Sequence, residues 1–360
     1  MKKLLYLYPK SGGLANYADK MSQAYAKISG IKMTAHAWPD QASVSEVFDY
    51  VQAESPDVVH FEIGSNQSTF YAVSQLLLGS KPFIKQIVTI HDPAIIVAHP
   101  SGWMLPAGRS PQLIFQKIIR LTHEKLWGRR HVRAWVQNRN IKIMVLRPGA
   151  IDGATYLPHP TFLPRKKVRS YKPNSVMKIG FLGYWDESKG LSTLLDAWEV
   201  GIDTATAQLT IYGDSFVPGD AYATTIKNRV NDMAGVSLGG IPDTTDDLTR
   251  LMRELDIVIL PYHLNNPAGV SGIAMRAAEV GVPIVASRAP QLTELLGNGA
   301  EFYNPADSSS ALHSAMKYAL QNYPVMMERA KQLQTRIYTD HSMTKLEDIL
   351  QSVLNSLQDK

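Results

Sequence analysis

The stretch LPYHLNNPAGVSGIAMRAAEVGVPIVAS, residues Leu260–Ser287, decides the fold class. With the apolar residues just before it, it predicts a buried strand at Ile257–Leu260, a loop with proline and glycine, a helix from Ser271–Gly272 and a second strand at Pro283–Ala286. Short apolar strands separated by a helix are typical of a parallel sheet covered on both faces.

The start of that helix also indicates a site that can bind an anion. The first N–H groups of a helix have no partner inside it, and the helix dipole favours negative charge at this end. Gly269 and Gly272 allow a phosphate to approach the main chain closely. Open α/β sheets bind ligands at loops of this kind, so the segment predicts a nucleotide or sugar-phosphate site.

The same alternation of strand and helix extends over the rest of the chain. Further strands are predicted at Leu4–Tyr8, Lys32–Ala37, Asp57–Phe61, Gln86–Ile90, Ile141–Leu146, Met177–Leu182, Gln208–Tyr212 and Val236–Gly239. Helices are predicted at Tyr17–Lys27, Val44–Ala53, Leu191–Val200, Thr224–Met233, Leu248–Glu254 and Ile273–Val280, and over most of Ser308–Leu357. Pro158–Asn174 holds four prolines and a basic cluster, as a linker does.

We therefore expect two Rossmann-like, doubly wound α/β domains that face each other across a cleft. The N-terminal domain is placed at residues 1–160, the linker at 161–175 and the C-terminal domain at 176–335. The last helix is placed at 336–360.

Composition narrows the class of protein. The chain has 360 residues, a net charge of +5 and no cysteine, which excludes disulfides and thiolate metal sites. Its apolar runs are too short for a spanning helix or a signal-peptide core. Residues 1–170 carry 22 Lys and Arg against 10 Asp and Glu, and the remainder carries 15 against 22. The basic half predicts an anionic partner, for which nucleic acid, anionic lipid and phosphorylated substrates all qualify.

The basic excess is largest near residues 108–135, where apolar, basic and tryptophan residues alternate. This pattern favours contact with an anionic membrane surface. An ordinary helix with an apolar buried side and a solvated basic side explains it equally well.

Three further segments follow predicted strands. Gly12 and Gly13 follow the first strand, either as a plain tight turn or as a helix start with exposed amides. His91 follows the strand at Gln86–Ile90, either as a structural histidine or as a group facing the cleft. Lys189, with Gly190, begins a predicted helix and is either a solvated lysine or a phosphate-binding charge. The sequence has no His-Glu-x-x-His and no Asp-x-Asp, so no metal is predicted.

In combination these motifs resemble GT-B glycosyltransferases, most of all the retaining family 4 group. The motifs are the early Gly-Gly loop, Thr89-Ile90-His91-Asp92, Leu157-Pro158-His159-Pro160, Gly183 with Lys189-Gly190-Leu191, Leu209–Asp214, Asp256–Tyr262, Gly269–Gly272, Gly281–Ser287 and Leu292–Leu295. Each is weak alone, but their order and spacing are specific.

The resemblance implies that the C-terminal domain binds a nucleoside-diphosphate sugar and the N-terminal domain binds the acceptor. The implied catalytic residues are His91 and Lys189. The implied donor-binding residues are Gly13, Gly183, Tyr184, Gly213, Ile241, Gly269, Val270, Ser271, Gly272 and Arg276, and the implied acceptor-binding residues are Gly12, Gly13 and His91. The last helix is expected to pack back on the N-terminal domain, and no metal or other cofactor is expected.

Two departures from the family pattern concern the donor. The family often has two glutamates eight residues apart, and here those positions hold Ala268 and Arg276. Tyr184 stands where an arginine is frequent. Arg276 could replace the missing phosphate-binding charge.

The predicted function is transfer of a sugar from a UDP- or GDP-sugar, with retention, to a glycan or lipid-linked glycan in bacterial-type polysaccharide or glycoconjugate synthesis. The predicted location is the cytoplasm, peripherally on the inner face of the plasma membrane. The alternatives are a non-catalytic GT-B scaffold subunit, a sugar-nucleotide epimerase and an inverting transferase. Nucleic-acid binding is a weaker interpretation of the basic half, because no nucleic-acid motif is present.

Overall fold

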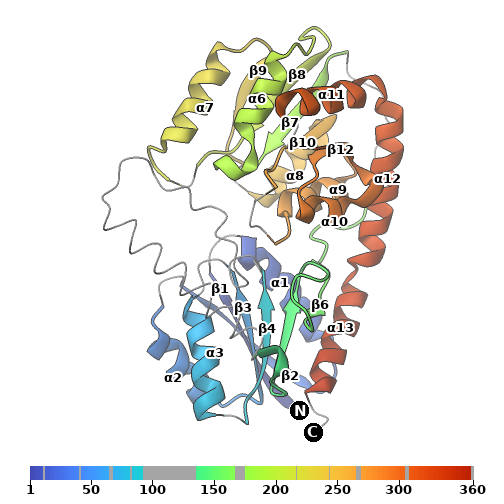
Figure 1. The fold of residues 1–360 in the computed structure, drawn as a ribbon. Coiled ribbons are helices and arrows are strands. Elements are labelled where there is room, and N and C mark those ends of the chain that lie inside the picture. Colours follow the sequence, from blue (N-terminus) through green and yellow to red (C-terminus); the bar gives the residue numbers. More distant parts are fainter. Residues whose placement is uncertain are drawn as a thin grey trace. The chain divides into compact units, whose positions relative to one another are not determined.

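The computed structural model describes residues 1–10, 13–39, 42–64, 68–81, 83–91, 135–166, 175–215, 217–242, 244–264, 269–304 and 308–357. The chain forms two compact units (Figure 1). The N-terminal unit contains Met1–Pro160, Pro267–Val270 and Asp340–Lys360, and the C-terminal unit contains Thr161–Asn266 and Ser271–Thr339. Among the described helices, none is long and apolar enough to cross a bilayer.

The N-terminal unit is built around a six-stranded parallel sheet in the order β2-β1-β3-β4-β5-β6. Its strands are β1 (Lys2–Pro9), β2 (Ile31–Trp38), β3 (Val58–Ile63), β4 (Lys85–Ile90), β5 (Ile141–Val145) and β6 (Thr155–Tyr156). Its helices are α1 (Gly13–Ala26), α2 (Val44–Glu54), α3 (Ser68–Ser80) and α13 (Met343–Ser356). Side chains alternate between the two faces of each strand, so one sheet supports two separate cores.

The two faces of this sheet differ in chemistry. One face packs against α2 and α3 mainly through apolar side chains, including Phe61 and Val88, and its buried polar side chains Ser74 and Gln86 hydrogen-bond to each other. The other face packs against α1 and α13, and its apolar cluster surrounds polar side chains described below. Lys27 of the segment after α1 forms an ion pair of 2.8 Å with Glu347 of α13.

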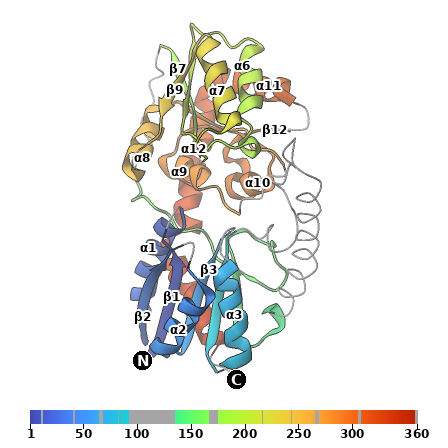
Figure 2. The same ribbon diagram turned by 90° about the vertical axis from the view of Figure 1, so that its left-hand side faces the viewer.

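The C-terminal unit has a second six-stranded parallel sheet, in the order β12-β11-β10-β7-β8-β9. Strands β7, β9 and β12 of this sheet are labelled in Figure 2. Its strands are β7 (Met177–Leu182), β8 (Ala207–Tyr212), β9 (Val236–Gly240), β10 (Ile257–Leu260), β11 (Ile284–Ser287) and β12 (Glu301–Tyr303). Its helices are α6 (Leu191–Glu199), α7 (Ala221–Asp232), α8 (Thr245–Glu254), α9 (Gly272–Val280), α10 (Pro290–Leu296), α11 (Ser308–Gln321) and α12 (Tyr323–Asp340), with the short 3-10 helices η1 (Glu187–Lys189) and η2 (Gly297–Gly299).

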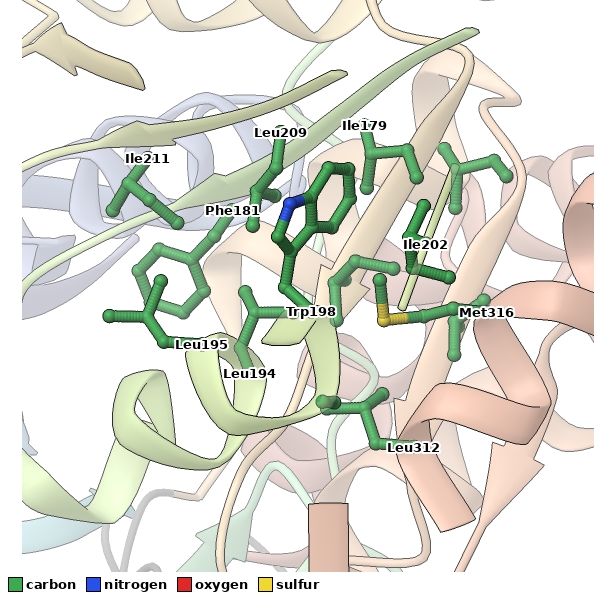
Figure 3. Packing of buried hydrophobic residues seen from close by; sticks show 14 of the residues in the cluster. Ile179, Phe181, Leu194, Leu195, Trp198, Ile202, Leu209, Ile211, Leu312 and Met316 are labelled. Carbon is green, nitrogen blue, oxygen red and sulfur yellow. The ribbon is translucent and has the colours of Figure 1, made fainter. Parts of the chain in front are cut away.

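The main core of this unit lies between the sheet and helices α6, α7 and α11. Figure 3 shows Trp198 of α6 among side chains from the strands and from α11, including Leu209 and Met316. The indole N–H of Trp198 donates to the carbonyl of Ala234 at 3.1 Å, so its one polar atom is satisfied inside the core.

The predicted α/β class with two doubly wound parallel sheets is confirmed. Several helix starts were predicted too late, because side-chain caps extend the helices beyond their apolar pattern. Asp220 caps α7 and Thr244 caps α8, each by accepting a hydrogen bond from a main-chain N–H of the first turn. The expectation that Lys189 begins a helix is wrong, because Lys189 ends η1 and Gly190 is the N-cap of α6.

Each sheet has a point at which its strand order reverses. It lies between β1 and β3 in the N-terminal unit and between β7 and β10 in the C-terminal unit. The loops that leave these strand pairs diverge, and ligands of doubly wound sheets bind in the crevice that results. Both candidate sites described next lie at these two positions.

Candidate functional site

In the C-terminal unit the loops after β7 and β10 lie in direct contact. Gly190 has a φ of +70°, and a Cβ built on it would lie 1.9 Å from the carbonyl oxygen of Pro261. The N–H of His263 donates to the carbonyl of Ser188 at 2.9 Å. Only glycine fits at position 190, and its presence allows the two loops to close on each other.

This contact holds Lys189 above an aromatic ring. Its Nζ lies 4.1 Å from the ring centroid of Tyr262, a buried residue. Among the described residues Lys189 has no carboxylate partner, so its charge is not neutralised by an ion pair. The ring orients the half-buried ammonium group without cancelling its charge, which leaves it able to bind an anion.

The same tyrosine connects the lysine to the start of α9. Its hydroxyl lies 3.0 Å from Oγ of Ser271, which also accepts the N–H of Ala274 as the helix N-cap. The main-chain bond from Met275 to Ser271 opens the helix, so the amides of Gly272 and Ile273 precede its hydrogen-bond ladder. A cation and two helix amides that have no partner among the described residues therefore lie at one end of the sheet.

The loops after β7 and β8 supply the remaining predicted donor residues. Gly213 has a φ of +117°, and a Cβ there would lie 1.8 Å from the carbonyl oxygen of Gly183. Its N–H donates to Gly240 at 2.8 Å, which ties β8 to the end of β9. Tyr184 is 52% exposed and Ile241 60% exposed. Their roles in donor binding stay predictions.

Arg276 lies further along α9 and is largely buried. Its guanidinium carbon lies 4.5 Å above the ring of Phe162, and its Nη1 has no hydrogen-bond partner within the described chain. Burial lowers the pKa of Arg276, while the nearby carboxylates of Glu279 and Asp246 oppose that shift. Arg276 therefore packs against Phe162, which lies where the chain enters the C-terminal unit. The predicted contact of Arg276 with phosphate stays a prediction.

In the N-terminal unit, His91 directly follows β4 and contacts a buried carboxylate. Its Nε2 lies 2.7 Å from Oε2 of Glu62, a residue with no exposed surface. The other oxygen of Glu62 accepts the hydroxyl of Tyr6 at 2.8 Å. The ring of Tyr17 from α1 meets the His91 imidazole edge-on, with 4.7 Å between centroids.

His60 extends this network. Its Nε2 lies 2.7 Å from Oγ1 of Thr89 and 3.3 Å from Oε1 of Glu62, and its Nδ1 lies 2.9 Å from the hydroxyl of Tyr25. Burial lowers the pKa of His60 to about 4, although Glu62 acts in the opposite direction. His60 is therefore a neutral member of the network at physiological pH.

Comparison with known proteins supports the sequence resemblance. Residues 176–322, which include most of the C-terminal unit, match the family described as glycosyl transferases group 1. The chain has the GT-B fold, and its residues 176–322 carry a glycosyl transferases group 1 domain. No curated protein matches its sequence. The predicted resemblance is confirmed at this level, and its placement in the retaining family 4 group stays a prediction.

Solved structures with the same fold cover almost the whole of this chain. HepE from Anabaena, solved with UDP and glucose, has 13% identity and a TM-score of 0.69, and the match covers 99% of this chain and 100% of HepE. Sucrose-phosphate synthase from Thermosynechococcus elongatus has 14% identity and a TM-score of 0.70, with 99% of each chain covered. A glycosyltransferase from Rickettsia africae has 10% identity and a TM-score of 0.66, covering 100% of this chain and 99% of that one.

The predicted site residues divide between the two units. Ser271 and Gly272 belong to the C-terminal unit with Lys189, whereas Gly269 and Val270 belong to the N-terminal unit with His91. Gly13 is the first residue of α1. Gly12, Ala268 and nearly all of the basic stretch 108–135 lie outside the described residues.

Sequence reasoning missed Glu62 and the residues around it. A signal was present, because His60 and Glu62 are two residues apart in a strand whose other residues are apolar. That spacing puts both on one face of β3. Two titratable side chains on one face of a buried strand must find polar partners, and this alone marks a candidate site.

Proposed function

We propose that this glycosyltransferase takes its sugar from a nucleoside-diphosphate sugar bound by the C-terminal unit. One observation carries the proposal: the ammonium group of Lys189, held on Tyr262 beside the N-terminus of α9, has no carboxylate partner among the described residues. A diphosphate has the charge and the acceptor oxygens that such a site requires.

The chemical task of this site is to stabilise a leaving group. As the bond between sugar and phosphate breaks, the anomeric carbon becomes positively charged and the diphosphate gains negative charge. Lys189 and the amides of Gly272 and Ile273 would stabilise that charge by several kcal/mol without a metal ion. We also propose retention of configuration, with an oxygen of the leaving diphosphate accepting the proton of the acceptor hydroxyl.

The N-terminal unit is proposed to bind the acceptor, a glycan or lipid-linked glycan of bacterial-type polysaccharide or glycoconjugate synthesis. His91 would contact the transferred sugar. The basic stretch 108–135 would bring the enzyme to an anionic membrane surface on the cytoplasmic side. Flotation with anionic and neutral liposomes tests this part, and equal recovery with both would count against it.

A thermal-shift screen tests the proposed donor. UDP, GDP, ADP and their sugars are added to the full chain, and UDP-glucose is the first choice because HepE was solved with it. A ligand at a hundred times its Kd adds about 2.7 kcal/mol to the stability of the native form. Proton NMR of the sugar released from a bound donor then identifies its anomeric configuration. Binding without turnover on any acceptor would favour a scaffold, and an altered sugar nucleotide would favour an epimerase.

A further inference from the structure

The N-terminal unit contains a carboxylate that donor binding does not explain. Glu62 is completely buried at the switch point between β1 and β3, on the face covered by α1. Burying an unpaired carboxylate is very unfavourable, so a buried one is expected to be hydrogen-bonded. Among the described residues, Tyr6 and His91 hydrogen-bond to Glu62, and Nε2 of His60 lies 3.3 Å from its Oε1.

The protons in this network can be assigned from its chemistry. Burial raises the pKa of Tyr6, and the charge of Glu62 raises it further, so the phenol keeps its proton and donates it to Oε1. His60 is neutral, and burial raises the pKa of Tyr25, so the phenol of Tyr25 keeps its proton and donates it to Nδ1 of His60, whose Nε2 then carries the ring proton. Nε2 of His60 lies closer to Oγ1 of Thr89, at 2.7 Å, than to Oε1 of Glu62, at 3.3 Å, so its N–H donates to Thr89. Oε1 of Glu62 therefore accepts from Tyr6, and Oε2 remains for His91.

We propose that Glu62 is the positioning residue of His91, fixing its imidazole in the Nε2–H tautomer and leaving Nδ1 to face the substrate. The charge-assisted hydrogen bond of 2.7 Å sets the ring orientation, the edge of Tyr17 packs against the ring, and the main-chain N–H of His91 donates to Ile63 at 2.9 Å. Among the residues that the structure describes, Nδ1 has no partner.

This arrangement gives His91 a defined role in the proposed reaction. In the Nε2–H tautomer, His91 accepts a hydrogen bond from a sugar hydroxyl at Nδ1 while its Nε2–H donates to the buried carboxylate of Glu62. The tautomer follows from the geometry alone. Its effect on turnover rests on the proposed function, so the two are tested separately.

The first test is NMR of the full chain with 15N-labelled histidine at neutral pH. The His91 signals are assigned by their loss in His91→Asn. The ring nitrogens of wild-type His91 are expected to show the Nε2–H tautomer. Observation of the Nδ1–H tautomer in the wild type would overturn the proposal, with no need for any variant of Glu62 to fold or for any substrate to bind.

Glu62→Gln sharpens the test. The amide oxygen is expected to turn toward the hydroxyl of Tyr6, which leaves the NH2 group facing His91. His91 Nε2 must then accept, so its proton moves to Nδ1. Glu279→Gln is the matched control, because Glu279 is also buried but receives main-chain N–H groups of the C-terminal unit. It is expected to leave the His91 tautomer unchanged. A His91 tautomer that is the same in Glu62→Gln and the wild type would contradict the assignment.

The last arm measures UDP-glucose hydrolysis. In Glu62→Gln, kcat is expected to fall roughly ten- to a hundredfold with an altered pH profile, while the KM for the donor changes less than about twofold. An unchanged kcat in a variant with a switched tautomer would remove Glu62 from the reaction. If wild-type protein shows the predicted tautomer but binds no sugar nucleotide, the proposed function fails while the positioning role stands.

Discussion

The switch points of the two sheets are built from different groups. In the N-terminal unit the position is filled by side chains from neighbouring strands, with Glu62 at the centre and a histidine on either side. In the C-terminal unit it is formed mainly by main chain, with glycines where loops touch and a single lysine resting on Tyr262. The charge of a titratable side chain changes with pH and with its surroundings, whereas main-chain amides remain hydrogen-bond donors at every pH. The predictions below test whether the two sites differ in this way.

The largest effect is expected at the lysine. Lys189→Ala should lower kcat/KM for a sugar nucleotide roughly 10²- to 10³-fold, because the leaving diphosphate loses the side-chain charge held beside the N-terminus of α9. Steady-state kinetics measures the loss, and circular dichroism checks that the fold is intact. Lys178→Ala is the control, since Lys178 is exposed on the same strand, β7. Equal kcat/KM in Lys189→Ala and wild type would contradict the proposed role.

The contact between the two loops predicts a difference between two glycines. Gly190→Ala should destabilise the protein by roughly 3 kcal/mol, from the left-handed φ together with a clash against the main chain of Pro261. Gly272→Ala should change stability by less than about 0.5 kcal/mol, because a Cβ there meets no atom within 4 Å. Urea denaturation of both variants measures the difference. Similar unfolding free energies for the two would show that the loops are not locked together.

The side-chain network predicts a dependence of stability on acid. The pKa of His60 is lowered in the folded protein to about 4 from an ordinary 6.5, so the unfolded chain binds a proton more readily. Above pH 6.5 His60 is neutral in both the folded and the unfolded state, so its titration does not change the free energy of unfolding. As the pH falls from 6.5 toward 4, the unfolded chain takes up the proton and the free energy of unfolding decreases. Between pH 7 and pH 5 the loss is about 2 kcal/mol. In His60→Asn the decrease in unfolding free energy over that range should be smaller by this amount, and an identical decrease would contradict the assignment.

A smaller effect is expected at the cap of α9. Ser271→Ala removes the acceptor for the N–H of Ala274 and the partner of the Tyr262 hydroxyl, and should cost about 1 kcal/mol. Ser271→Thr keeps a hydroxyl and should recover most of that stability. Thermal unfolding of the two variants provides the measurement, and equal melting points would argue against a structural cap.

The sequence predicts the main-chain site better than the side-chain site. The helix start at Ser271–Gly272 can be read locally, because a cap residue, a glycine and an apolar run adjoin each other. The stacking of Lys189 on Tyr262 depends on loops more than 70 residues apart, and their contact follows from the strand order rather than from any local pattern. The position of His91 directly after a predicted strand marked it as a candidate site residue, but the sequence did not identify Glu62 as its hydrogen-bond partner.

Glu62 illustrates why the rest was not predicted. Alternation along β3 places it on one face with His60, yet the pairing with His91 requires the register between β3 and β4, in which Ile63 lies beside Ile90. Register depends on how two strands pair, so it cannot be predicted from the sequence of either strand alone. Arg276 is similar, because its stacking on Phe162 depends on the path of the chain after Pro160.

The central claim is that the C-terminal unit holds the diphosphate of a sugar nucleotide. A crystal structure of the full chain with UDP tests it most directly. The account predicts phosphate oxygens within hydrogen-bond distance of Lys189 Nζ and of the amides of Gly272 and Ile273. A diphosphate bound elsewhere, with Lys189 making no contact to it, would contradict the account.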